Sequence, residues 1–138
     1  MIRDCKLTNI KNVHDARGNI AFLQSYDIPF VIKRIYYIYS IPDAANRGAH
    51  AHRNLHQFMI AINGSFKISL FDGSEKKDFI LDNPEEGLYI PPMIWRDMSG
   101  FKNNSICLVA ASENYDEGDY YRDYDEFTRD AKSNINCS

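Results

Sequence analysis

The chain has 138 residues, of which 44% are hydrophobic and 25% charged, and its formal net charge is −3. These values are typical of one soluble domain, residues 1–138, that is long enough to bury a core. The scattered Lys and Arg exclude the basic face of a nucleic-acid-binding protein. No run approaches the ~18 apolar residues that span a membrane. Three widely separated cysteines and no N-terminal signal segment favour a reduced, cytoplasmic protein.

Short apolar or alternating runs, separated by turn residues, predict seven or more β-strands. In chain order the runs occupy residues 20–24, 31–40, 57–62, 65–71, 77–81, 87–90 and 105–111. Asn63-Gly64 predicts a tight hairpin between two of them. Helical spacing of Tyr124, Phe127 and Ala131 predicts a helix over residues 123–133. The sequence therefore predicts an all-β sandwich or barrel of antiparallel strands with a short C-terminal helix.

The clearest chemical signal is the stretch Arg47-Gly48-Ala49-His50-Ala51-His52. Side chains alternate between the faces of a strand, so His50 and His52 are expected on one face. Two imidazoles in one pocket can ligate a metal or move protons between atoms of a substrate. Arg47, just upstream, could hold an anion beside them. A histidine pair with this setting favours a functional site over two core histidines.

This order of features resembles the cupin superfamily, whose jelly-roll fold carries two sequence motifs. The residues that match the first motif are Gly48, His50, His52 and Gly64. His56 or Gln57 stands where that motif has a glutamate. The second motif matches residues 87–96 and puts Arg96 at the position of a metal-binding histidine.

The residue at that position argues against a metal. A guanidinium stays protonated and has no lone pair to donate, so Arg96 cannot be a ligand. We therefore predict no metal and no other cofactor, and the chain also lacks a Gly-rich dinucleotide motif. A zinc site made by His50, His52 and His56 remains an alternative. Without a metal, His50 and His52 become candidate acid–base groups.

Further blocks, spread over residues 20–127, resemble the nucleotide-sugar 3,4-ketoisomerases, a WxcM-like family of cupins. The blocks are residues 33–38, 47–52, 63–65, 87–90, 95–98 and 111–120. The resemblance implies a small-molecule substrate, dTDP-4-keto-6-deoxy-D-glucose, whose C3 proton is removed and returned at C4 through an enediol. It also implies a 3-keto product that feeds synthesis of a 3-amino-3,6-dideoxyhexose for surface glycans such as lipopolysaccharide O-antigen.

This chemistry suggests a role for each candidate residue. We take His52 as the carbon acid/base and His50 as the partner that handles the sugar oxygens, although the reverse order is also open. Tyr37 is the preferred neighbouring hydroxyl and Tyr36 the alternative, since only one of two adjacent strand residues faces the site. The candidate substrate-binding residues are Arg17, Arg34, Tyr36, Arg47, Trp95 and Arg96. Residues 115–124 are expected to cover the barrel mouth or a neighbouring subunit without a catalytic role.

Two other readings stay open. The Arg-Gly-x-His element and residues 15–18 also resemble dTDP-4-keto-rhamnose epimerases, so a 3,5-epimerase-type cupin is one alternative. A non-catalytic sugar-nucleotide or metal-binding cupin is the other. For the ketoisomerase, the resemblance implies a homodimer in which an N-terminal strand covers the neighbour's sheet edge and Arg17 reaches the partner's pocket. We expect a gluco-configured product, with Arg96 as a position that influences the configuration.

Overall fold

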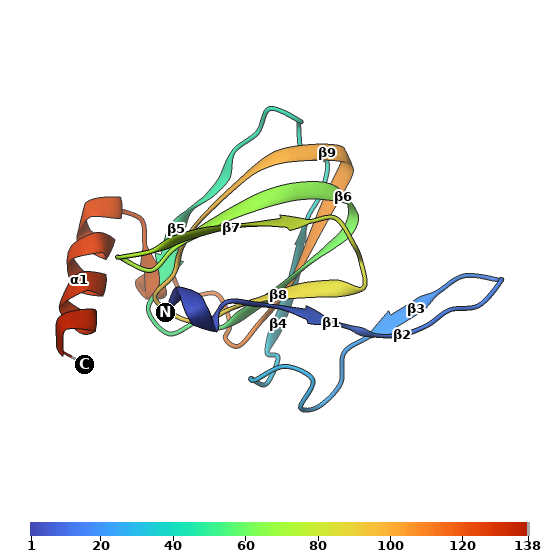
Figure 1. Cartoon of the computed structure of the whole chain (residues 1–138), viewed down its shortest axis with the longest axis horizontal. Helices are drawn as coiled ribbons and strands as arrows, with labels where there is room; N and C mark the ends of the chain where they lie inside the picture. The colour runs from blue at the N-terminus through green and yellow to red at the C-terminus, as the bar shows by residue number, and fades with distance from the viewer. Residues whose placement is uncertain (138) are drawn as a thin grey trace.

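The computed structural model describes residues 1–137 and shows a barrel of antiparallel strands with an α-helix at one end and a two-stranded arm at the other (Figure 1). The strands are β1 (Lys6–Asn9), β2 (Lys11–Val13), β3 (Ile20–Phe22), β4 (Arg34–Ile38), β5 (Arg47–His52), β6 (Gln57–Phe71), β7 (Lys76–Leu81), β8 (Glu86–Ile90), β9 (Trp95–Ala111) and β10 (Tyr120–Tyr121). The helices are α1 (Tyr124–Cys137) and the 3-10 turns η1 (Ile2–Asp4) and η2 (Glu117–Asp119).

The barrel is built around its two longest strands, β6 and β9, which pair along almost their whole length. The main sheet has the order β1-β8-β6-β9-β5-β10, while β4 pairs with β9 and β7 pairs with β6. The first half of β6 pairs with β8 and the second half with β7, so this strand passes from one layer to the other. The arrangement confirms the predicted all-β jelly roll with a short C-terminal helix.

The predicted hairpin at Asn63-Gly64 is wrong. Strand β6 continues through this pair, and its register with β9 shifts on both sides of Asn63. Gly64 has a φ of +69°, and a Cβ there would lie 2.3 Å from the carbonyl oxygen of Lys102. The glycine therefore serves a bulge where β6 bends between layers, not a two-residue turn.

The core lies between the two layers and consists of aliphatic and aromatic side chains from β6, β7, β8 and β9. A smaller cluster fixes α1, because Phe127 and Ala131 are buried against Trp95, Ala51 and Tyr121. The predicted helix is thus present, and it extends from Tyr124 to Cys137. No helix within residues 1–137 is long and apolar enough to cross a membrane.

The N-terminal region differs most from expectation. The sequence did not indicate β1 or β2, and the first predicted strand is reduced to Ile20–Phe22. Strands β2 and β3 form a separate antiparallel pair in which every residue is exposed, and this arm projects away from the barrel (Figure 1). Its exposed apolar side chains, Val13, Ile20 and Phe22, have no core of their own chain to bury them.

Candidate active site

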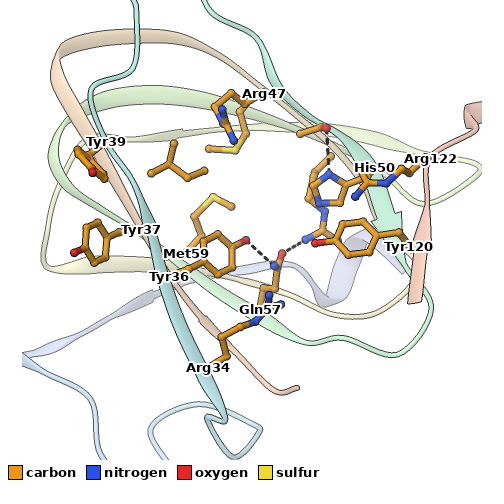
Figure 2. A pocket seen from close by; sticks show the side chains of 14 residues that line it. Arg34, Tyr36, Tyr37, Tyr39, Arg47, His50, Gln57, Met59, Tyr120 and Arg122 are labelled. Carbon is orange, nitrogen blue, oxygen red and sulfur yellow. Dashed lines mark hydrogen bonds between the residues drawn. The ribbon is translucent and has the colours of Figure 1, made fainter. Parts of the chain in front are cut away.

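A cleft of about 530 Å³ opens into the barrel between β4, β5, β6 and β9 (Figure 2). The polar side chains that line it include Arg34, Tyr36, Arg47, His50, Gln57, Arg96, Tyr120 and Arg122. Most come from strand positions that face the barrel interior, so the fold gathers cationic and hydrogen-bonding groups around one space. Such a cleft suits an anionic, polar ligand.

His50 lies in this cleft as a neutral base. Its Nδ1 is 3.1 Å from the carbonyl oxygen of Gly48. Because a carbonyl only accepts hydrogen bonds, Nδ1 carries the proton and Nε2 keeps its lone pair. Burial, together with the guanidinium of Arg96, lowers the pKa of His50 to about 4. The ring is therefore unprotonated near neutral pH and able to take a proton.

A bulge in β5 sets the position of His50. The pairing of β5 with β9 shifts between Gly48 and His50, and Ala49 has a φ of +57°. A Cβ on Gly48 would lie 2.8 Å from the carbonyl oxygen of Arg96, so this glycine permits the close approach of the two strands. The local Gly-Ala sequence thus turns the first histidine of the pair into the cleft.

His52 lies behind His50, with the two ring centroids 5.0 Å apart. It is only 1% exposed and lines a second cavity of about 440 Å³ rather than the main cleft. Burial and the charge of Arg96 lower the pKa of His52 far below its usual value, so this ring is neutral too. The two rings are neighbours, but the main cleft is lined by His50 alone of the pair. This geometry favours the reverse of our assignment, with His50 as the carbon base.

A buried network forms the floor of the cleft. The guanidinium of Arg96 is 1% exposed and donates to Gln57 Oε1 and, at 2.9 Å, to the carbonyl oxygen of Ile94. Gln57 Nε2 in turn donates to the Tyr36 hydroxyl at 2.9 Å (Figure 2). Burial lowers the pKa of Arg96 to about 10, which still leaves it charged near neutral pH. Its Nε has no hydrogen-bond partner within residues 1–137, so the floor presents a cation with spare donor capacity.

Of the two adjacent tyrosines, Tyr36 points to the interior, and our preference for Tyr37 is corrected. Burial alternates along β4, as expected for a strand with one face on the core. Tyr37 is 61% exposed and lies beside Tyr39 at the rim of the cleft, away from His50 (Figure 2). Tyr36 is instead tied through Gln57 to the cationic floor.

Two predicted residues, Arg17 and Trp95, do not line the cleft of their own chain. The Arg17 side chain is 90% exposed in the loop of the arm, where it pairs with Asp15. Trp95 is buried beneath α1, its ring 5.3 Å from that of Tyr124, because the first residue of β9 faces the helix. The expectation that Trp95 lines the sugar or base pocket is therefore wrong.

The three-histidine zinc alternative is also contradicted. His56 does not line the cleft, and its Nδ1 is instead 2.7 Å from the Tyr89 hydroxyl. Within residues 1–137 there is no cluster of three or more His, Cys, Asp or Glu that could hold a metal ion. At the position of the motif's glutamate, it is Gln57 rather than His56 that faces the site.

Sequence reasoning missed Tyr120 and Arg122, which come from a segment to which we assigned no chemistry. The two-residue strand β10 pairs with β5, placing Tyr120 opposite His52. The Tyr120 ring lies 5.1 Å from that of His50, and the Arg122 guanidinium lies 4.2 Å from the Tyr120 ring centroid (Figure 2). Glu117 holds Arg122 in place through a 2.9 Å hydrogen bond. A strand of two residues has no periodicity that could have revealed this contact.

Comparison with known proteins identifies a family for this chain. The family model described as FdtA, WxcM-like, C-terminal, matches residues 3–132. A curated relative, TDP-4-oxo-6-deoxy-alpha-D-glucose-3,4-oxoisomerase of Aneurinibacillus thermoaerophilus, is 41% identical over 90% of both chains.

Solved structures extend the match. The sugar 3,4-ketoisomerase QdtA of Thermoanaerobacterium thermosaccharolyticum, in complex with TDP, is 42% identical, has a TM-score of 0.94 and covers 98% of this chain and 99% of its own. A 3,4-ketoisomerase from Helicobacter canadensis is 45% identical, with a TM-score of 0.90 over 94% and 98% of the two chains. The sugar epimerase NovW of Streptomyces spheroides, at 13% identity and a TM-score of 0.72 over 85% of this chain and 67% of its own, shares the fold alone. The chain therefore belongs to the WxcM-like family of sugar 3,4-ketoisomerases and is an isomerase.

Proposed function

We propose that this protein converts dTDP-4-keto-6-deoxy-D-glucose into a dTDP-3-keto-6-deoxyhexose. The observation that carries the proposal is His50, a neutral imidazole with a free Nε2 in a cleft surrounded by arginines. The relatives support the choice of substrate, since a histidine-to-asparagine variant of QdtA has been crystallised with TDP-4-keto-6-deoxyglucose. We also propose that residues 1–138 act as a single catalytic domain.

The carbon steps need one base. His50 Nε2 takes the proton from C3, the C3–H electrons form the C3=C4 double bond, and the C4 carbonyl oxygen becomes an enediolate oxygen. The N–H proton of protonated His50 exchanges with solvent, and His50 then delivers a proton to C4 while the C3 oxygen becomes the new carbonyl. Arg96, a buried cation in the floor, stabilises the negative oxygen that develops between the two steps.

The oxygen steps need a second proton carrier. The hydroxyl proton at C3 must leave and the oxygen at C4 must gain a proton, so that the ketone moves with no net loss of hydrogen. Tyr36, which lines the same cleft, can serve through its hydroxyl, and His52, which lies beside His50, can serve through its lone pair on Nε2. No redox step is required.

The diphosphate needs cations near the mouth of the cleft. Arg34, Arg47 and Arg122 line the cleft in addition to Arg96, and the buried Nε of Arg34 has no hydrogen-bond partner within residues 1–137. Guanidinium groups bind phosphate oxygens in bidentate fashion, which fixes the orientation of the attached sugar. We assign these three arginines to the nucleotide diphosphate.

A homodimer would complete the site. Strand β4 borders the cleft and pairs within residues 1–137 with β9 alone, so its other edge offers unpaired backbone groups. The arm of β2 and β3 carries exposed apolar side chains that need a partner. We propose that the arm of one subunit covers this edge of the other and brings Arg17 to the partner's cleft.

The product would supply an aminotransferase that makes a 3-amino-3,6-dideoxyhexose for a surface glycan such as O-antigen. We propose a gluco configuration at C4 and a cytoplasmic location. Cys5 and Cys107 are buried free thiols, as expected in a reducing compartment.

Proton NMR of the purified protein with dTDP-4-keto-6-deoxy-D-glucose in heavy water tests the function. We expect a 3-keto sugar deuterated at C4, formed equally well with and without EDTA. His50→Asn should slow turnover by about 10²- to 10⁴-fold while TDP binding is retained. Exchange at C3 and C5 with the ketone still at C4 would indicate an epimerase, and tight binding without exchange would indicate a binding protein.

A further inference from the structure

His52 has a carboxylate partner, Asp119, that the mechanism above does not use. Asp119, at the end of η2, places its Oδ2 3.1 Å from His52 Nδ1. Its other carboxylate oxygen, Oδ1, accepts a 2.7 Å hydrogen bond from the backbone N–H of Asn54. The carboxylate is thus held from two sides, between the loop after β5 and the histidine.

This contact fixes the tautomer of His52. A carboxylate only accepts hydrogen bonds, and a neutral imidazole has one N–H, so that N–H is on Nδ1. The lone pair is then on Nε2, which is buried and has no hydrogen-bond partner within residues 1–137. A buried polar atom without a partner is destabilising, because it has lost its hydrogen bonds to water. An unpartnered Nε2 beside the cleft indicates that its hydrogen-bond donor is the bound substrate or a water molecule that takes part in the reaction.

The surroundings keep His52 neutral between catalytic events. The charged and titratable groups around His52 come from several elements and include His50, Arg34, Arg96, Asp119, Tyr120 and Arg122. Three of these are cations, which oppose protonation, and a single carboxylate supports it. A proton taken up at Nε2 would therefore be held briefly, with Asp119 stabilising the imidazolium, and passed on.

We infer that Asp119 is a positioning residue that holds His52 with its lone pair on Nε2, so that His52 relays the hydroxyl proton of the sugar. This inference rests on the proposed function and deepens it. In the relay, the O–H bond at C3 breaks and its proton binds Nε2, directly or through one water. The same proton then forms the O–H bond at C4, which restores the neutral ring. The carbon proton is carried separately by His50.

The variant Asp119→Asn tests the inference with little change in shape. The Asn54 N–H still requires an acceptor, so the amide oxygen stays there and the amide NH₂ turns to His52. Nδ1 must then accept, the proton moves to Nε2, and the lone pair is lost. We expect kcat to fall by about 10²- to 10⁴-fold with KM changed less than about threefold.

The matched control is Asp116→Asn. Asp116 lies in the same segment and accepts a local 3.0 Å hydrogen bond from the Gly118 N–H, which an amide oxygen can also accept, and it does not touch His52. This variant should keep wild-type kcat and melting temperature. A general loosening of the segment would instead lower both in the two variants alike, which would overturn the inference.

The tautomer itself is measured by nitrogen-15 NMR of the histidine side chains, which separates protonated from unprotonated ring nitrogens. We expect the His52 proton on Nδ1 in the wild type and on Nε2 in Asp119→Asn. A wild-type His52 with its proton on Nε2, or an altered tautomer with undiminished kcat, would overturn the inference alone. Absence of turnover by the wild-type protein would instead refute the proposed function. The wild-type spectrum requires no variant, so the test survives if Asp119→Asn fails to fold.

Discussion

The floor of the cleft and the projecting arm solve opposite physical problems. In the floor, Arg96, Gln57 and Tyr36 are polar groups inside a barrel, and they satisfy one another through hydrogen bonds. In the arm, Ile20 and Phe22 are exposed apolar groups outside the barrel, and neither belongs to a buried core cluster of the chain. Buried polar groups require partners, and clustered exposed apolar groups favour association.

One subunit is therefore sufficient to build the floor of the cleft, but it does not bury the arm. The floor is complete within a single subunit, so the roles of its residues can be inferred from the geometry of one chain. The arm makes physical sense only with a second surface, so the role of Arg17 at its tip depends on assembly. Three predictions test this division, and they are ordered from the largest expected effect to the smallest.

The double variant Ile20→Asp/Phe22→Asp should separate the proposed dimer. Charges on the arm would oppose its burial against another subunit, whereas neither Ile20 nor Phe22 belongs to a buried core cluster of the chain. We expect the mass from light scattering to halve. Turnover should fall by about 10- to 100-fold, because a charge-assisted hydrogen bond from Arg17 is worth about 1.5–3 kcal/mol.

The control is Ile80→Asp, which puts the same charge on an exposed apolar residue of strand β7, outside the arm. It should leave both mass and turnover unchanged. A wild-type protein that is already monomeric would end the proposal that Arg17 serves the partner's cleft.

Replacing Tyr36 and Tyr37 in turn tests which face of β4 contributes to turnover. Tyr36→Phe removes the hydroxyl that accepts from Gln57, which is worth about 0.5–1.5 kcal/mol, so turnover should fall about 2- to 10-fold. Tyr37→Phe, at the exposed rim, should stay within about twofold of wild type. Steady-state kinetics on both variants checks this. A larger loss of turnover in Tyr37→Phe than in Tyr36→Phe would restore our first preference for Tyr37.

The pH dependence of stability tests the burial of His50. Its pKa is about 4 in the folded protein and about 6.5 in the unfolded chain, so the unfolded state binds more protons between these values. The stabilising contribution of neutral His50 is full above pH 6.5 and is lost as the pH falls toward 4. Urea unfolding should show a stability that falls by up to about 1.4 kcal/mol per pH unit in this window for this group. His50→Asn should show a shallower slope, and equal slopes would mean that the ring is not held neutral.

Several features of the site followed from local pattern in the sequence. Alternation along a strand was enough to predict that His50 and His52 would be neighbours, and their rings are 5.0 Å apart. The charge of Arg96 could likewise be assigned from residue type, since a guanidinium keeps its proton even when buried. The helix was predictable because Tyr124, Phe127 and Ala131 recur with helical spacing on the face that packs against the barrel.

Tertiary structure decided what local pattern leaves open. The Asn63-Gly64 pair has the composition of a hairpin, yet pairing with β9 on both sides makes it a bulge within one strand. A bulge at Gly48 and Ala49 decided that His50, and not His52, lines the cleft. Packing under α1 removed Trp95 from the site.

The sequence by itself thus determined the fold class, the chemical types in the site and the family to which they point. The tertiary structure decided which side of each strand faces the cleft and that Tyr120, Arg122 and Asp119 join the histidines. The physical reason is the range of the interactions. Periodicity and residue charge are local properties of the chain, whereas bulges, strand pairing and the partner of a buried nitrogen depend on residues far apart in sequence, such as His52 and Asp119.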